Sequence, residues 1–175
     1  MIDFTQNYFA LFGLPQRYRF DPEKLDTAYR ALQRVVHPDR YAAAGDAERR
    51  MALQSSARVN EAYRALKDPV SRAQYLLSLR GIDALAETNT ALPAEFLQRE
   101  LERREAVGEA QAARDADRLA ALLREVRSDA AALETTLADR LDVEAWEEAR
   151  DAARELRFLT KVAGDIEVAI GEVEG

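Results

Sequence analysis

Cysteine is absent from this chain of 175 residues, and histidine and tryptophan each occur once. Without cysteine there is no disulfide framework, no thiolate nucleophile and no cysteine-based ligation of zinc or an iron–sulfur cluster. The single histidine excludes a metal site built from several histidines. We therefore expect no metal and no cofactor, and the composition is compatible with a reducing compartment.

Long apolar runs are also missing, because no stretch approaches the roughly eighteen residues of a membrane span and no basic N-terminal region precedes an apolar segment. We expect a soluble, unprocessed chain. The hydrophobic content of 47% argues against disorder. Charge is uneven: residues 1–94 contain 13 basic and 11 acidic side chains, whereas residues 95–175 contain 12 basic and 21 acidic. The two halves are expected to bind different partners.

Apolar residues recur at spacings of three and four, and β-branched clusters of period two are absent, so the sequence predicts an all-α fold. A short helix at 8–12 ends at Gly13-Leu14-Pro15. Helices then begin at Asp21-Pro22 and Asp68-Pro69, because Asp caps a first turn and Pro fits the first helical position. Pro38 ends the earlier of these, Asp46 is expected to cap another, and Gly81 closes the unit. The apolar faces are predicted to include Leu25, Leu32, Val35 and Val36, then Met51, Leu53, Val59 and Leu66.

Residues 82–92 show little periodicity and are interpreted as a linker between a unit at 1–81 and a second unit at 93–175. The second unit is predicted to hold three helices. Pro93 opens the first, which fades at Gly108, the second starts at about Ala112, and Asp142 caps the third. Their regular apolar stripes favour an antiparallel bundle. Those stripes include Leu119, Leu122, Val126, Leu133 and Leu137, then Ala149, Ala153, Leu156, Leu159, Ile166 and Ile170.

His37-Pro38-Asp39 lies at the exit of a helix whose other side carries Lys24, Arg30 and Arg34. Alone, the tripeptide could be a helix stop and a capped turn, and the basic residues an ordinary solvated face. Catalysis is disfavoured, because no phosphate-binding loop and no acidic cluster with metal-ligand spacing accompanies this histidine. A basic helix with a rigid loop could instead speed encounter with an acidic partner and rearrange its charge pairs. We expect a binding protein, not an enzyme.

Several separated blocks resemble the J-domain of the J-protein co-chaperones. They are Tyr29-Arg30-Ala31-Leu32, Val36-His37-Pro38-Asp39-Arg40, Asn60-Glu61-Ala62-Tyr63, Leu66, Asp68-Pro69, Arg72 and Tyr75. The resemblance implies a four-helix J-domain that docks on a DnaK/HscA-type ATPase chaperone and stimulates its ATP hydrolysis. It assigns docking to Tyr29, Arg30, Arg34 and Arg40, and the trigger to His37, Pro38 and Asp39. Ala31 stands where many members have a basic residue, which implies a less positive face.

Further blocks resemble the HscB-type co-chaperones of iron–sulfur cluster assembly. They are the run from Tyr8 to Pro15, Gln54-Ser55-Ser56-Ala57, the run from Arg72 to Leu79, and Leu156-Arg157-Phe158-Leu159. An acidic helical bundle directly after a short linker is also that family's plan, whereas general J-proteins continue into Gly/Phe-rich and client-binding regions. The resemblance implies that the bundle binds an IscU-type scaffold protein. The matching residues are Leu97, Leu101, Glu102, Glu105, Glu109 and Phe158, with Gln98 at a position that is often apolar.

The helical phase allows these residues to form an exposed patch. At about 100° per residue, Phe96 and Val107 share one line, while Leu97 and Leu101 fall about 100–140° away. The alternative is that all of them complete one wide buried stripe, which is usual for leucine on a helix. An apolar spot bordered by carboxylates is nevertheless typical of a binding surface.

The sequence therefore predicts an adaptor that brings the scaffold to the chaperone and stimulates its ATPase. We expect neither a nucleic acid nor a membrane as partner, and a cytoplasmic location of bacterial type. Two alternatives stay open. One is a structural or self-associating helical protein in which the His-Pro-Asp loop is incidental. The other is a J-protein whose client is unrelated to iron–sulfur work.

Overall fold

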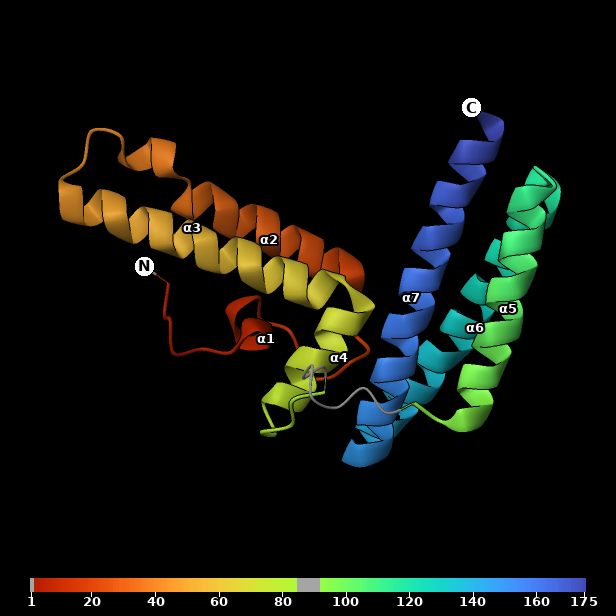
Figure 1. The fold of residues 1–175 in the computed structure, drawn as a ribbon. Coiled ribbons are helices and arrows are strands. Elements are labelled where there is room, and N and C mark those ends of the chain that lie inside the picture. The colour runs from red at the N-terminus through yellow and green to blue at the C-terminus, as the bar shows by residue number, and fades with distance from the viewer. Residues whose placement is uncertain (1, 85–91) are drawn as a thin grey trace. The chain divides into compact units, whose positions relative to one another are not determined.

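The computed structural model describes residues 2–84 and 92–175, and every regular element in those ranges is a helix (Figure 1). The predicted all-α fold is confirmed. The chain divides into two compact units, residues 1–79 and 80–175. The segment interpreted as a linker, 82–92, falls mainly on residues 85–91, which lie outside the described residues.

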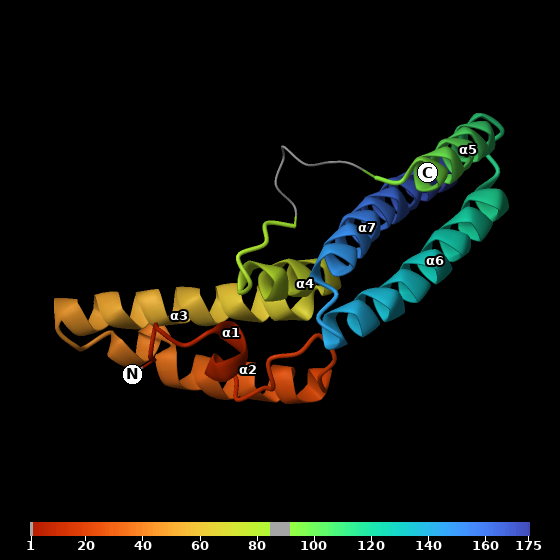
Figure 2. The same ribbon diagram turned by 90° about the horizontal axis from the view of Figure 1, so that it is seen from below.

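The first unit contains four α-helices and one turn of 3-10 helix. The helices are α1 (Tyr8–Leu11), α2 (Pro22–Val36), α3 (Asp46–Lys67) and α4 (Pro69–Ser78), with the 3-10 helix η1 (Pro38–Tyr41) between α2 and α3. The helices α2 and α3 lie side by side and antiparallel (Figures 1 and 2). The core is made by the largest buried side chains of all four helices, which are Phe9, Leu25, Val59, Leu66 and Leu77.

Capping side chains fix where these helices start. Asp21 accepts a hydrogen bond from the Glu23 amide at 2.9 Å, and Asp68 accepts one from the Ser71 amide at 2.7 Å. Both Asp-Pro predictions are confirmed. The prediction that Asp46 caps α3 is wrong, because Asp46 is already helical and Gly45 stands at the cap without a side-chain bond. Asp46 instead lies in the first turn, where its negative charge interacts favourably with the helix dipole, and it pairs with Arg49 three residues ahead.

Three apolar residues predicted to line the helix faces are exposed. Val35 is 49% exposed, Met51 36% and Leu53 56%. The buried line of α3 passes through Ala52, Val59 and other residues, and Leu53 lies about 100° around the helix from Ala52. Apolar identity alone therefore gave the wrong face at these positions.

The second unit is a bundle of three long helices, α5 (Ala94–Ala112), α6 (Ala116–Asp142) and α7 (Trp146–Glu174), which run side by side (Figures 1 and 2). The predicted three-helix bundle is confirmed. Its core cluster includes side chains from all three helices, such as Phe96, Leu119, Val126, Leu159 and Ile166.

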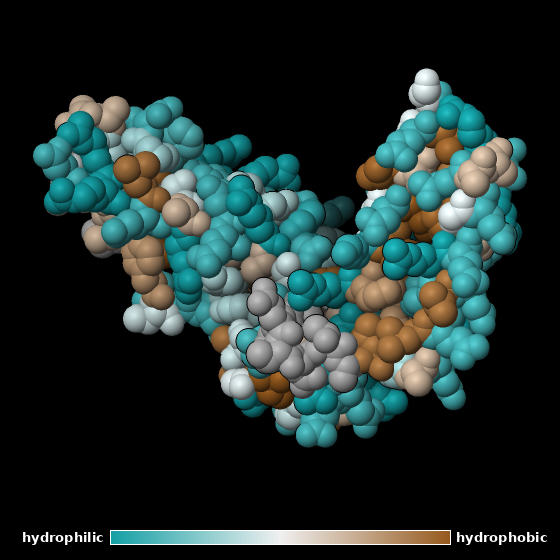
Figure 3. Space-filling model, viewed as in Figure 1, coloured by the Kyte–Doolittle hydropathy of each residue, from teal (hydrophilic) through white to brown (hydrophobic). Residues whose placement is uncertain are grey.

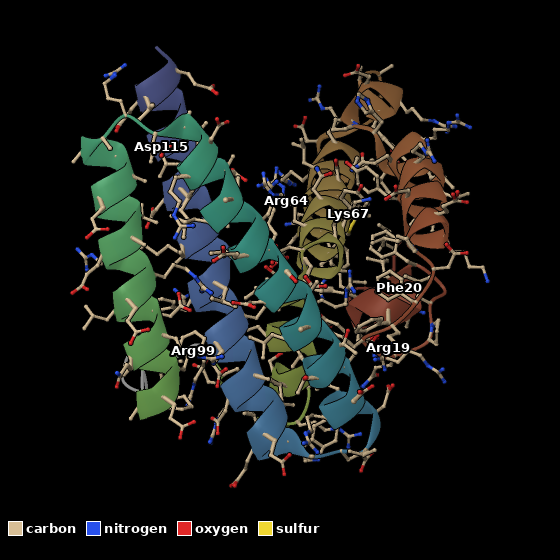
Figure 4. The ribbon with its side chains drawn as sticks, turned by 90° about the vertical axis from the view of Figure 1, so that its right-hand side faces the viewer. Arg19, Phe20, Arg64, Lys67, Arg99 and Asp115 are labelled. Carbon is tan, nitrogen blue, oxygen red and sulfur yellow. The ribbon has the colours of Figure 1, made fainter. Side chains whose placement is uncertain are left out.

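Three predicted boundaries in the bundle are wrong. The first helix passes through Gly108 and ends at Ala112, since an interior glycine weakens a helix without ending it. The second helix starts at Ala116, and its cap is Asp115, which accepts a bond from the Arg118 amide at 2.9 Å (Figure 4). Asp142 is the last residue of α6, and the residue preceding α7 is Ala145.

Both turns of the bundle reverse the chain through a residue in the left-handed region. Arg114 has φ 51° and Glu144 has φ 58°. In the first turn, the Asp115 amide donates to the Ala110 carbonyl and the Arg114 amide to the Gln111 carbonyl. The second turn repeats this pattern, so each is a Schellman motif. Glycine usually occupies the left-handed position, which explains why no helix stop could be recognised at these residues in the sequence.

Candidate functional site

The His37-Pro38-Asp39 loop projects its two ionisable side chains into solvent. α2 ends at Val36, His37 adopts an extended conformation (φ −60°, ψ 127°), and Pro38 opens η1. The side chain of His37 is 54% exposed and that of Asp39 is 91% exposed. Both groups are therefore accessible to a binding partner. The sequence did not predict the 3-10 turn that carries Asp39.

Local hydrogen bonds hold the loop. The Asp39 amide donates to His37 Nδ1 at 3.3 Å, and the Arg40 amide donates to the His37 carbonyl at 3.0 Å. Two side chains then reach back to α2: Arg40 Nη1 donates to the Arg34 carbonyl at 2.8 Å, and the Tyr41 hydroxyl donates to the Val35 carbonyl at 3.3 Å. These bonds satisfy carbonyls that every helix leaves unpaired at its C-terminus. Arg40 is therefore part of the loop's support as well as a charge beside it.

The basic residues of α2 differ in their surroundings. Arg30 and Arg34 are exposed and lie one turn apart, and Lys24 is exposed near the start of the helix. Tyr29 is half-buried: its ring stacks on Tyr63 with 4.0 Å between ring centroids, and its hydroxyl donates to Asn60 Oδ1 at 2.9 Å. The arginines thus present exposed charge, although Arg30 Nε also donates to the Asp26 carbonyl at 3.2 Å, while Tyr29 is engaged with α3.

The first helix of the bundle has an exposed apolar side. Leu97 is 46% exposed and Leu101 is 59% exposed, whereas Phe96 is buried. Val107 is half-buried against the core, so the two predicted lines of α5 are separate. The alternative in which both leucines complete the buried stripe is wrong. Glu102, Glu105 and Glu109 are exposed on the same helix. Figure 3 shows apolar side chains gathered on one face of this unit.

Phe158 takes an intermediate position. It is half-buried against the core cluster of the bundle and meets Phe96 edge to face, with ring centroids 5.6 Å apart. It therefore contacts the residue that precedes Leu97. Gln98, the departure from the usual apolar residue, donates its amide to Glu102 at 3.4 Å. Gln98 is thus paired with one of the predicted scaffold-binding carboxylates, and Phe158 contacts the buried residue beside Leu97.

Sequence reasoning missed a set of polar contacts between α2 and α3. Asn60 Oδ1 accepts from Gln33 Nε2 at 2.6 Å as well as from Tyr29. Asp26 accepts from Lys67 and from Tyr63 at the other end of the same helix pair. The three-and-four spacing of polar residues on each helix was visible in the sequence, but it identifies a contact only once the helices are paired.

Within residues 2–84 and 92–175 no group of three or more histidine, aspartate or glutamate side chains is arranged to hold a metal ion. In the same ranges no helix is long and apolar enough to cross a membrane.

Comparison with known proteins identifies both units. Residues 7–75 match the family model described as DnaJ domain, and residues 92–167 match the one described as HSCB C-terminal oligomerisation domain. The chain is 47% identical to a co-chaperone protein HscB homolog of Burkholderia multivorans, over 99% of both chains. The chain belongs to the HscB family of co-chaperones. The first unit is therefore a J-domain, and the second is the C-terminal domain of an HscB.

Solved HscB structures share this fold over nearly the whole chain. Chaperone HscB from Vibrio cholerae has a TM-score of 0.87 at 36% identity, covering 96% of this chain and 99% of that one. The human co-chaperone protein HscB has a TM-score of 0.89 at 28% identity, covering 95% and 83%. The HscB resemblance of the sequence, J-domain included, is confirmed.

Proposed function

We propose that this chain stimulates the ATPase of a DnaK/HscA-type chaperone through its His37-Pro38-Asp39 loop. The observation that carries the proposal is the exposure of both ionisable side chains on a loop fixed by its own hydrogen bonds. A rigid loop loses little conformational entropy on docking, so more of its contact energy is available to the complex. The bond-breaking chemistry then belongs to the chaperone, and this chain acts as its activator.

The exposed arginines of α2 supply the attraction. Arg30 and Arg34 lie on the helix that ends at the loop, where they would meet an acidic surface of the chaperone. Charges of this kind mainly raise the association rate and fix the orientation of the encounter. Pro38 sets the turn, and Arg40 ties it to α2. Tyr29 contributes to the docking face of α2 from its half-buried position.

We further propose that the C-terminal domain binds an IscU-type scaffold of iron–sulfur cluster assembly. Leu97 and Leu101 offer an exposed apolar centre, and Phe158 adjoins it through Phe96. Glu102, Glu105 and Glu109 provide carboxylates along the same helix. An apolar centre with a charged rim is the usual composition of a protein-binding patch. The scaffold would carry the cluster, so the co-chaperone needs no metal ligand.

A chain that binds both partners raises the effective concentration of the scaffold at the chaperone. The function we propose is therefore delivery coupled to activation. The same J-domain could act on the chaperone with no scaffold present, which makes the two activities separable by experiment.

The decisive experiment is steady-state ATP turnover by a purified DnaK-type chaperone, with and without an IscU-type scaffold, as this protein is titrated. We expect the protein to raise turnover and the scaffold to increase that effect. We expect His37→Gln to abolish stimulation with an unchanged melting temperature, because the side chain is exposed and its loss disturbs no core contact. Normal stimulation by this variant would refute the assignment of the loop.

Self-association is a second candidate role for the C-terminal domain, favoured by the oligomerisation named in the description of its family model. Leu97 and Leu101 could pack against a second copy instead of a scaffold. Sedimentation equilibrium separates the two roles. If the protein is a monomer at the concentrations of the ATPase assay, no second copy covers the two leucines and they are available to bind the scaffold.

A further inference from the structure

A ladder of polar and aromatic contacts joins α2 to α3 in the J-domain. Near the start of α2, the Asp26 carboxylate accepts from Lys67 Nζ at 2.7 Å and from the Tyr63 hydroxyl at 3.0 Å (Lys67 in Figure 4). These two bonds hold the pKa of Asp26 below its usual value, with the Lys67 bond the larger cause. One turn later, the rings of Tyr29 and Tyr63 stack at 4.0 Å.

Asn60 on α3 forms the end of this ladder that is nearest to the loop, because its partner Gln33 lies four residues before His37. Its Oδ1 accepts from the Tyr29 hydroxyl at 2.9 Å and from Gln33 Nε2 at 2.6 Å. These two donors are four residues apart, one turn of α2. A single oxygen that holds both fixes the rotation of α2 about its axis and its position along α3, because either motion would lengthen one of the bonds.

The anchored stripe leads directly to the loop. Tyr29, Gln33 and His37 follow one another at intervals of four residues, so they lie on one side of α2 and its exit. Arg30 and Arg34 each come one residue after an anchored side chain, about 100° further around the helix. A rotation of α2 would therefore displace both arginines and the start of the loop together.

We propose that Asn60 is a positioning residue for chaperone docking, which sets the orientation of the α2 arginines and of the loop without touching the chaperone. This inference rests on the proposed function and adds to it a residue on α3 that lies outside the loop and the basic face. The loop keeps its own geometry through the Arg40 and Asp39 bonds, so loss of Asn60 impairs encounter and leaves the trigger intact.

The test titrates each variant into a purified DnaK-type chaperone and separates the concentration for half-maximal ATPase stimulation from the maximal rate. Asn60→Leu removes the acceptor while it keeps the branching and the number of heavy atoms of the side chain. We expect about a three- to tenfold higher half-maximal concentration with an unchanged maximal rate, since one or two hydrogen bonds are lost. Gln54→Leu, an exposed amide on α3, is the matched control and is expected to match the parent protein. All assays are run where circular dichroism shows each variant folded.

Asn60→Asp keeps an oxygen for both donors but adds a negative charge. If Asn60 acts by positioning, this variant should reach half-maximal stimulation at nearly the same concentration as the parent protein. If Asn60 instead touches an acidic surface of the chaperone, Asn60→Asp is worse than Asn60→Leu, and the proposal is overturned.

A double-mutant cycle gives a second test. Gln33→Leu should raise the half-maximal concentration on its own, and combining it with Asn60→Leu should cost less than the two changes added together, because they remove one shared contact. Additive effects would overturn the proposal, as would a parent-like titration of Asn60→Leu. A parent protein that fails to stimulate the chaperone at all would instead defeat the proposed function, so the two failures are distinguishable.

Discussion

At the scale of single residues, burial and charge conflict at Glu155 on α7. This carboxyl is half-buried and lines a groove formed by residues of α5, α6 and α7, and desolvation raises its pKa despite the opposing effect of Arg99 (Figure 4). An acid whose pKa is raised by folding destabilises the folded state when it is ionised. The penalty is absent well below pH 4.5, the usual pKa of glutamate, and complete above the raised value.

We therefore expect Glu155→Gln to raise the melting temperature at pH 7 by roughly 1–3 °C. The gain should shrink as the pH falls from the raised pKa through 4.5 and vanish well below 4.5, because Glu155 is then neutral in both the folded and the unfolded protein. Thermal unfolding followed by circular dichroism at a series of pH values measures this. Glu172→Gln, exposed on the same helix, is the control. A gain that persists at low pH would show that charge is not the cause.

At the scale of helices and turns, local chemistry decided what the sequence could predict. The Asp-Pro starts of α2 and α4 were predictable, because the cap and the ring act within one turn. The turns of the bundle were not predictable, because Arg114 and Glu144 occupy left-handed positions at which glycine is the usual residue. The exposure of Leu53 and the Asn60 contacts depend on how α2 and α3 pair, which residue spacing alone does not define. The separation of Leu97 from Phe96 was predictable, because it follows from helical phase.

The turn between α6 and α7 gives a prediction of its own. Glu144→Val should lower the free energy of unfolding by about 1–2 kcal/mol, because a β-branched side chain fits the left-handed region poorly. Glu144→Gly should lose only the exposed ion pair with Arg80, which contributes little to the free energy of unfolding. Both variants lose that pair, so their difference in chemical denaturation reports the backbone alone. Equal stabilities would contradict the assigned conformation.

At the scale of the whole molecule, the functions proposed for the two domains are separable by mutation. We expect Leu97→Ala with Leu101→Ala to weaken scaffold binding about tenfold, measured by calorimetry. Both leucines are exposed, so stability should change by less than about 0.5 kcal/mol per site. Phe158 is a poorer probe, because its truncation would also remove the contact with Phe96.

The two leucine substitutions should not change the action of the J-domain on the chaperone. Stimulation of the chaperone without scaffold is expected to match the parent protein, while the additional effect of the scaffold is lost. Leu53→Ala, an equally exposed leucine in the J-domain, is the control and should leave scaffold affinity unchanged. Unaltered scaffold affinity in the double variant would place the binding surface elsewhere on the bundle.

The bonds from Arg40 and Tyr41 to the last carbonyls of α2 join the loop to the end of its helix. The loop and the last turn of α2 therefore open together, because opening that turn breaks both hydrogen bonds and closing it forms them again. The tip of the J-domain is thus a small cooperative unit within the domain. Heat or denaturant that melts this unit would abolish the proposed stimulation of the chaperone while the core of the J-domain was still intact.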